Sequence, residues 1–209
     1  IAHHGPRGFY QGKTARLLAT EMAANGGLIT EEDLNDYNAK RRKPVHGSYR
    51  GYDILSMPPP SSGGIAVVEM LNILEGYDLA SFGYGSAATL HCYAEVMRRA
   101  FADRANHVGD PEANPDMPID RLVSKPYADS LRNTIQEKQA SVSSPTSFTW
   151  NHESSETTHF SVVDGQRNAV SLTTTLEHSY GSSIVVPGAG FLLNNEMGDF
   201  NPVPGLTNA

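Results

Sequence analysis

Residues 139–156 form a polar segment, rich in Ser and Thr, that separates two parts of the sequence with different apolar patterns. We expect this segment to be exposed and mobile, because it shows little periodicity of either kind. Before it, apolar residues recur mainly at helical spacing, and after it they alternate as in a β-strand. The sequence therefore predicts an α+β protein in which a flexible linker leads directly into a strand.

The part before the linker is expected to be mainly helical. A capping box from Thr30 to Asp33 marks the start of one short helix, and Gly26-Gly27 end the helix before it. Residues 45–57 are expected to be extended, with a turn near Gly51. The predicted helices cover residues 13–24, 31–37, 65–74 and 86–107, with another after Pro126. The longest of them has five apolar residues at helical spacing: Ala87, Leu90, Ala94, Met97 and Phe101.

The part after the linker is predicted to form strands. Thr158–Val163 alternates, Asn168–Thr175 is rich in Val, Leu and Thr, and Asp164-Gly165 lies in the short connection between them. This pattern predicts a β-hairpin. Gly190–Leu193 is expected to form a third strand.

Composition excludes few classes of protein. The formal net charge of −7 argues against nucleic-acid binding, which usually needs a basic face. No apolar run reaches the roughly 18 residues of a membrane-spanning helix. Cys92 is the only cysteine, so we expect a buried, inert thiol and no disulfide within the chain. Ile1 at the start and a loop-like sequence at the end suggest a piece of a longer polypeptide.

The junction between Glu156 and Thr157 has the features that an N-terminal nucleophile requires. Cleavage there would free the α-amine of Thr157, which could take the proton from its own hydroxyl. The pKa of such amines is about 7.7–8.0, so a useful fraction of them is neutral at physiological pH. An exposed linker would make the bond accessible, and a strand would hold the hydroxyl. On composition alone, however, the β propensity of threonine is the favoured explanation of Thr157-Thr158.

The wider sequence resembles the gamma-glutamyltransferase family. Thr157-Thr158-His159-Phe160-Ser161-Val162-Val163-Asp164 is similar to the start of the small subunit in these enzymes. Further matching blocks occur in the family's order: Asn25–Thr30, Tyr49–Tyr52, Met57–Gly64 and Leu192–Met197. The resemblance covers nearly the whole chain. It implies a four-layer αββα sandwich of the N-terminal-nucleophile (Ntn) hydrolase type, incomplete in these residues. Residues 1–156 would then belong to the large subunit and residues 157–209 to the small subunit.

The resemblance also implies roles for individual residues. Thr157 would be the autoprocessing residue and the nucleophile, with Thr175 as the hydroxyl that positions it. Glu177, Glu196 and Asp199 would hold the α-ammonium group of the substrate through charge-assisted hydrogen bonds. The simpler alternative for Thr175 is an ordinary strand position. The simpler alternative for Glu177, Glu196 and Asp199 is that of solvated loop acids. His159 and His178 are expected to be structural. Arg98, Arg99 and Arg104, on the long helix, are expected to be surface or ion-pairing residues.

The implied activity is gamma-glutamyl transfer and hydrolysis, with glutathione as a donor and with water, amino acids or peptides as acceptors. No metal or organic cofactor is implied, and the two subunits of one precursor would form a heterodimer in the periplasm or outside the cell. An arginine before Ile1 and Ser-Ser and Gly-Gly segments after Ala209 would complete the site. Two alternatives remain open, a related glutaryl or cephalosporin acylase and a non-catalytic relative. The three acids disfavour the acylase, because a glutaryl group lacks the ammonium.

Overall fold

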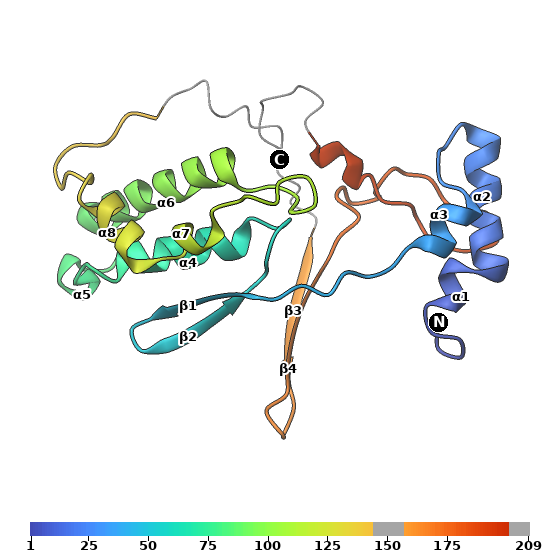
Figure 1. Cartoon of the computed structure of the whole chain (residues 1–209), viewed down its shortest axis with the longest axis horizontal. Helices are drawn as coiled ribbons and strands as arrows, with labels where there is room; N and C mark the ends of the chain where they lie inside the picture. The colour runs from blue at the N-terminus through green and yellow to red at the C-terminus, as the bar shows by residue number, and fades with distance from the viewer. Residues whose placement is uncertain (144–156, 201–209) are drawn as a thin grey trace. The chain divides into compact units, whose positions relative to one another are not determined.

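The computed structural model describes residues 1–143 and 157–200 (Figure 1). Contacts divide the chain into two compact units, which are described separately below. The first unit contains residues 1–40 together with the described residues from 157 onward, and the second contains residues 41–143. The predicted linker, from residue 144 to Glu156, lies outside the described residues.

The first unit combines short helices with one β-hairpin. Its elements are α1 (Arg7–Tyr10), α2 (Gly12–Asn25), α3 (Glu31–Asp36), β3 (Thr158–Val163), β4 (Ala169–Thr174) and the 3₁₀ helix η2 (Glu196–Asp199). Its core joins segments far apart in sequence, because Val186 is fully buried against Ala15 and Leu18 of α2 and Leu34 of α3. This core brings the region after β4 onto the N-terminal helices.

The ends of α2 and α3 follow the sequence signals. Gly26 ends α2 in the left-handed conformation, with φ of 75°, which glycine adopts without strain. At the start of α3, the Asp33 backbone N–H donates to Thr30 Oγ1 at 3.1 Å, and Thr30 N–H donates back to Asp33 Oδ2 at 2.8 Å. The predicted capping box is therefore confirmed.

The predicted β-hairpin is also confirmed. β3 and β4 are antiparallel, with a register that runs from Thr158 opposite Thr174 to Val163 opposite Ala169. Asp164 holds the connection, because its Oδ1 accepts hydrogen bonds from the backbone N–H groups of Gln166 and Asn168.

The two faces of this hairpin differ in chemistry, because side chains alternate along a strand. One face is apolar, and its four central side chains are 40–55% exposed: Phe160, Val162, Val170 and Leu172. On the other face, His159 Nδ1 lies 2.8 Å from Thr173 Oγ1, and His159 Nε2 lies 3.0 Å from Ser171 Oγ. His159 therefore links the two strands, in agreement with its predicted structural role.

The prediction of a third strand over Gly190–Leu193 is wrong. That segment forms only an isolated bridge, between Leu192 and Val185. Gly188 and Gly190 both have positive φ, at 74° and 76°, so the chain turns sharply just before the bridge. Its alternating side chains pack on the core of the first unit instead, because Phe191 and Leu193 contact the buried cluster that contains Leu18.

The second unit is a small helical assembly with one hairpin. Its elements are β1 (Val45–Tyr49), β2 (Tyr52–Ser56), α4 (Gly63–Leu74), α5 (Leu79–Phe82), α6 (Ala87–His107), α7 (Ile119–Leu122) and α8 (Lys125–Arg132). Helix α4 lies at its centre and contacts α6, α8 and the β1–β2 hairpin (Figure 1). The predicted helices and the turn at Gly51 are confirmed.

Glycine permits the close approach of α4 to this hairpin. A Cβ at Gly47 of β1 would lie 2.4 Å from Cγ1 of Val68, a residue of α4 that is 1% exposed. Two apolar clusters flank α4, one around Ile65 and Leu122 and the other around Ile73 and Val96.

Helix α6 packs through a different face from the one that its apolar spacing suggests. Cys92, Val96 and Ala100 are buried, as expected for the cysteine, and burial raises the pKa of the Cys92 thiol. Leu90 and Met97, which belong to the apolar series used to predict the helix, are 61% and 49% exposed. Spacing identified the helix but not its contact face, because helices of this length can carry apolar residues on both faces.

Ser141, near the start of the predicted linker, is tied to α6. The Ser141 backbone N–H donates to Glu95 Oε1 at 2.9 Å, and Arg99 Nη1 lies 2.8 Å from Glu95 Oε2. Burial alone would raise the pKa of Glu95, but the hydrogen bonds from Ser141 and Arg99 outweigh it and lower that pKa to about 2. The polar composition of residues 139–143 did not predict this anchor, whereas the ion-pairing role of Arg99 was expected.

A second buried acid, Glu69 of α4, faces Asp103 of α6. Glu69 is 1% exposed, and burial together with the charge of Asp103 raises its pKa to about 8. The Tyr127 hydroxyl of α8 donates to Asp103 Oδ2 at 2.7 Å, and Arg121 lies 4.5 Å from the centre of the Tyr127 ring. The raised pKa favours a protonated Glu69 beside Asp103.

We expect this pair to make stability depend on pH. Because folding raises the pKa of Glu69, its contribution to stability is complete below the unfolded pKa and is lost as pH rises towards about 8. Glu69→Gln stays neutral, so the variant should gain stability relative to the parent between about pH 5 and pH 9. Thermal unfolding of both proteins across this range measures the difference. If the stability of the two proteins changed in parallel with pH, the raised pKa of Glu69 would be contradicted.

Candidate active site

Thr157 immediately precedes β3 and is exposed. The β3–β4 register ends at Thr158 opposite Thr174. Continued by one residue, the same register would pair Thr157 with Thr175. Both side chains would then lie on the hairpin face that carries His159, since side chains two residues apart share a face. Glu156, the other side of the predicted scissile bond, lies outside the described residues.

The chain after β4 turns at Thr175 and buries Glu177. Thr175 Oγ1 accepts a hydrogen bond of 2.8 Å from the backbone N–H of Glu177. Glu177 has a φ of 74°, in the left-handed region that costs an ordinary residue about 1–2 kcal/mol. The residue is 7% exposed, and its Oε2 lies 3.2 Å from His178 Nδ1. The simpler alternative of a solvated loop acid therefore does not describe Glu177.

Glu177, Glu196 and Asp199 lie close enough to affect one another, and we call them the acidic cluster. Glu196 begins η2 and Asp199 ends it. Partial burial raises the pKa of Glu196, and the nearby charges of Asp199 and Glu177 raise it further. Glu177 thus shares one negative field with Glu196 and Asp199, which lie nineteen or more positions further along the sequence. Such a field favours the binding of a cation, which would relieve the repulsion between the carboxylates.

Asn195 connects the two segments that carry the acidic cluster, and sequence reasoning assigned it no role. Its backbone N–H donates to Leu176 O at 3.1 Å, and its Oδ1 accepts from the His178 N–H at 3.1 Å. Asn195 is also the residue before η2. An asparagine before Glu196 is a typical capping signal, but its side chain bonds the other segment instead.

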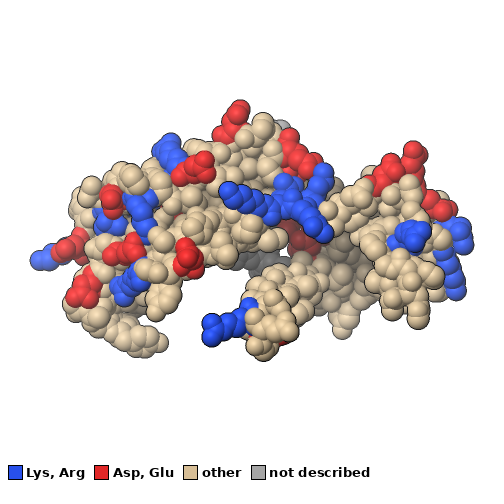
Figure 2. Space-filling model, turned by 60° about the horizontal axis from the view of Figure 1, so that its bottom comes forward, with Lys and Arg blue, Asp and Glu red and all other residues tan. Residues whose placement is uncertain are grey.

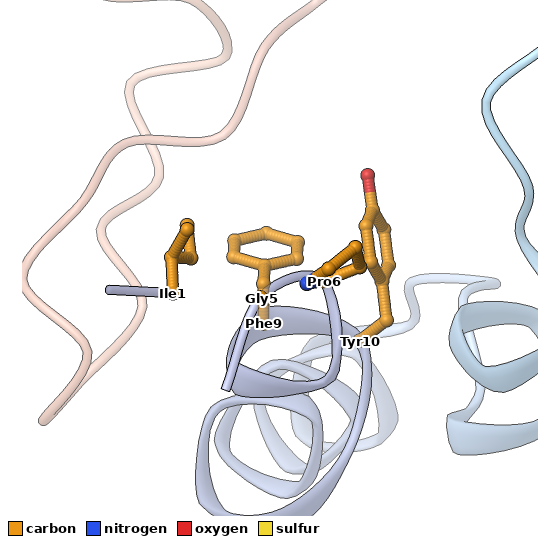
Figure 3. A pocket seen from close by; sticks show the side chains of 5 residues that line it. All are labelled: Ile1, Gly5, Pro6, Phe9 and Tyr10. Carbon is orange, nitrogen blue, oxygen red and sulfur yellow. The ribbon is translucent and has the colours of Figure 1, made fainter. Parts of the chain in front are cut away.

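Two pockets formed by the described residues lie away from the predicted site residues. One pocket of about 330 Å³ is lined by Ile1, Gly5, Pro6, Phe9 and Tyr10, and Figure 3 shows the Phe9 ring between Ile1 and Pro6. Another, of about 310 Å³, is lined by residues 106–107 and 113–118. Neither of these two pockets is lined by a predicted site residue.

Other classes of site find little support in the part of the chain that the structure describes. Uncharged residues cover most of the face in Figure 2, and acidic and basic side chains are interspersed on it. Among residues 1–143 and 157–200, no group of three or more His, Cys, Asp or Glu side chains could hold a metal ion. No helix within the same residues is long and apolar enough to cross a membrane.

Comparison with known proteins places this chain in a family. The model of the gamma-glutamyltranspeptidase family matches residues 1–209. The chain is 47% identical over 211 residues to a glutathione hydrolase proenzyme of Escherichia coli K12, covering 100% of this chain and 36% of the relative. It is also 47% identical to an acylase ACY 1 proenzyme of Pseudomonas sp. SE83, covering 98% of this chain and 36% of that protein.

A solved structure indicates the same family. The gamma-glutamyltranspeptidase of Helicobacter pylori superposes with a TM-score of 0.65 at 48% sequence identity, covering 68% of this chain and 40% of that one. The fold is therefore of the Ntn-hydrolase type, as expected, and the described residues supply helices and two hairpins of its α+β architecture. The chain belongs to the gamma-glutamyltranspeptidase family. It spans about 36% of the length of these curated relatives.

Proposed function

We propose that the protein containing this chain is a gamma-glutamyltransferase and glutathione hydrolase that matures by cutting itself between Glu156 and Thr157. Both curated relatives described above are named proenzymes. The observation that carries the choice of substrate is the acidic cluster, because its mutual repulsion favours a donor with an α-ammonium group. A glutaryl donor offers no cation to offset that negative charge.

The first chemical step is maturation. The Thr157 hydroxyl attacks the carbonyl carbon of Glu156, and the amide bond breaks as the acyl group moves from nitrogen to oxygen. Water then hydrolyses the ester, which leaves a carboxylate on Glu156 and a free α-amine on Thr157. The second product is the active nucleophile, with its own base attached. In this account residues 1–156 end the large subunit and residues 157–209 begin the small subunit of a heterodimer.

In turnover, the Thr157 α-amine takes the hydroxyl proton while the oxygen attacks the γ-carbonyl of the donor. Thr175 would orient the hydroxyl from the facing strand, as the register suggests. The tetrahedral intermediate expels the donor's amine, which receives the proton, and a γ-glutamyl ester remains on Thr157. Water or an acceptor amine then attacks the ester and restores the hydroxyl. Each step uses only groups of the protein and its substrates.

The main alternative is an acylase, since an acylase proenzyme is as similar in sequence as a glutathione hydrolase proenzyme. The two functions differ in the donor's α-ammonium. We expect the whole processed protein to hydrolyse a γ-glutamyl anilide much faster than the matching glutaryl anilide, by about a hundredfold or more. Release of the aniline measures both rates. Equal rates, or a preference for the glutaryl compound, would favour the acylase.

We further propose that the enzyme works in the periplasm or outside the cell, where glutathione is available as a donor. The resemblance to gamma-glutamyltransferases is the basis for this location. Fractionation of the producing cells, with the two fragments followed by antibody, would test it. Processed enzyme confined to the cytoplasm would contradict the proposed location but not the proposed chemistry.

A further inference from the structure

Asn195 lies where the two segments of the acidic cluster meet. On one side, its backbone N–H bonds Leu176 O and its Oδ1 bonds the His178 N–H, each at 3.1 Å. These two hydrogen bonds fall on the residues immediately before and after Glu177. On the other side, the Asn195 carbonyl accepts from the Gly198 N–H at 2.8 Å and so begins η2, which carries Glu196 and Asp199.

The acidic cluster needs such a connection because it opposes its own assembly. Glu177 adopts a left-handed backbone conformation that an L side chain rarely prefers. The neighbouring carboxylates repel one another, as the raised pKa of Glu196 reflects. Without a bound cation, both effects favour movement of Glu177 away from η2. Two hydrogen bonds that bracket Glu177 hold it in place and keep the cluster preorganised.

Nearby contacts hold the same loop without bracketing Glu177. The backbone N–H and Oγ of Ser182 both donate to Leu193 O, at 2.9 and 3.1 Å. A Cβ at Gly181 would lie 2.1 Å from the same oxygen, so the two segments touch closely there. These contacts fix the packing of the loop, whereas the contacts of Asn195 fix the backbone on either side of Glu177.

We propose that Asn195 is a positioning residue that holds Glu177 against Glu196 and Asp199 and thereby sets the affinity for donors with an α-ammonium group. This inference rests on the function proposed above. Asn195 does not touch the reacting atoms in this account, and it acts only through the acidic cluster. Its loss should therefore weaken binding of the ammonium while leaving the nucleophile and its chemistry in place.

Three variants of the whole protein test this role. Asn195→Ala removes the Oδ1 acceptor, Asn195→Asp keeps an acceptor oxygen at the same place, and Ser182→Ala removes one hydrogen bond of the same loop outside the bracket. For Asn195→Ala we expect the KM for glutathione to rise about fivefold and kcat to change less than about twofold. For Ser182→Ala we expect the KM to stay within about twofold to threefold of the parent. For Asn195→Asp, which keeps the acceptor oxygen but adds a carboxylate beside the acidic cluster, we expect the KM to rise less than for Asn195→Ala.

Competitive inhibition provides the readout that a merely structural defect would not move. L-Glutamate carries the α-ammonium and glutarate lacks it. In Asn195→Ala the inhibition constant for L-glutamate should rise about fivefold, while that for glutarate should change less than about twofold. Equal changes for both inhibitors, an unchanged KM, or failure of both Asn195 variants to mature would overturn the inference. A parental protein that neither matures nor hydrolyses glutathione would overturn the proposed function itself.

Discussion

Thr157→Ala is expected to leave the protein as one uncut polypeptide with no measurable γ-glutamyl hydrolysis. The variant lacks the hydroxyl that would attack Glu156 in maturation and the donor in turnover. Loss of a catalytic nucleophile costs about 10⁴–10⁶-fold in kcat in other hydrolases, and here the unbroken peptide would also withhold the α-amine base. A denaturing gel follows the cleavage, and release of aniline from a γ-glutamyl anilide follows the activity.

Thr158→Ala is the matched control for this prediction. It removes the same atoms from the next residue, whose side chain lies on the opposite face of the hairpin because strand side chains alternate. We expect this variant to mature and to keep activity within about tenfold of the parent. Thr157→Ser, which retains a hydroxyl, should mature slowly. Normal cleavage in Thr157→Ala would remove Thr157 from the mechanism.

Asp199→Asn is expected to lower kcat/KM for γ-glutamyl donors by about a hundredfold, mainly by raising KM. The change removes one of three carboxylates that would face the ammonium, and losing one partner of a partly desolvated charge pair costs about 2–5 kcal/mol. The Asn side chain is nearly isosteric, so the fold of η2 should persist. Steady-state kinetics with glutathione measure the effect, and Asp116→Asn, a change at an exposed acid of the other unit, is the control.

The same variant makes a prediction about pH. The charge of Asp199 contributes to the raised pKa of Glu196, after partial burial. Donor binding needs ionised Glu196, so it should weaken as pH falls through that pKa. Removing the Asp199 charge lowers the pKa of Glu196, and the acid limb of kcat/KM should therefore move to lower pH. An acid limb that stays in place would show that Asp199 and Glu196 act on different parts of the donor.

Local signals in the sequence were sufficient for most elements of the fold. The capping box at Thr30, the glycine that ends α2 and the alternation after Thr157 each act within a few residues, so they can be recognised without tertiary contacts. The prediction of a third strand was wrong because Phe191 and Leu193 pack on a core that is built partly from the N-terminal helices, which are remote in sequence. The contact face of α6 could not be predicted for the same reason, since spacing does not reveal which neighbour covers an apolar face.

The candidate site divides in a similar way. Family motifs indicated Thr157, Thr175 and the three acids, and the structure adds that the acids share one electrostatic environment. Neither the left-handed backbone at Glu177 nor the bracket around it could be predicted, because both depend on hydrogen bonds between segments about eighteen residues apart. Sequence reasoning assigned Asn195 no role. The role that we propose for it depends on its hydrogen bonds with Leu176 and His178.

The most direct test of this account is the N-terminal sequence of the fragments formed when the purified whole protein is incubated. We predict two fragments, and the smaller should begin Thr-Thr-His-Phe, which places the cut between Glu156 and Thr157. After brief exposure to a γ-glutamyl donor and an acid quench, mass spectrometry should find the γ-glutamyl group on Thr157. A protein that remains a single chain, or one cut at another bond, would contradict Thr157 as the N-terminal nucleophile.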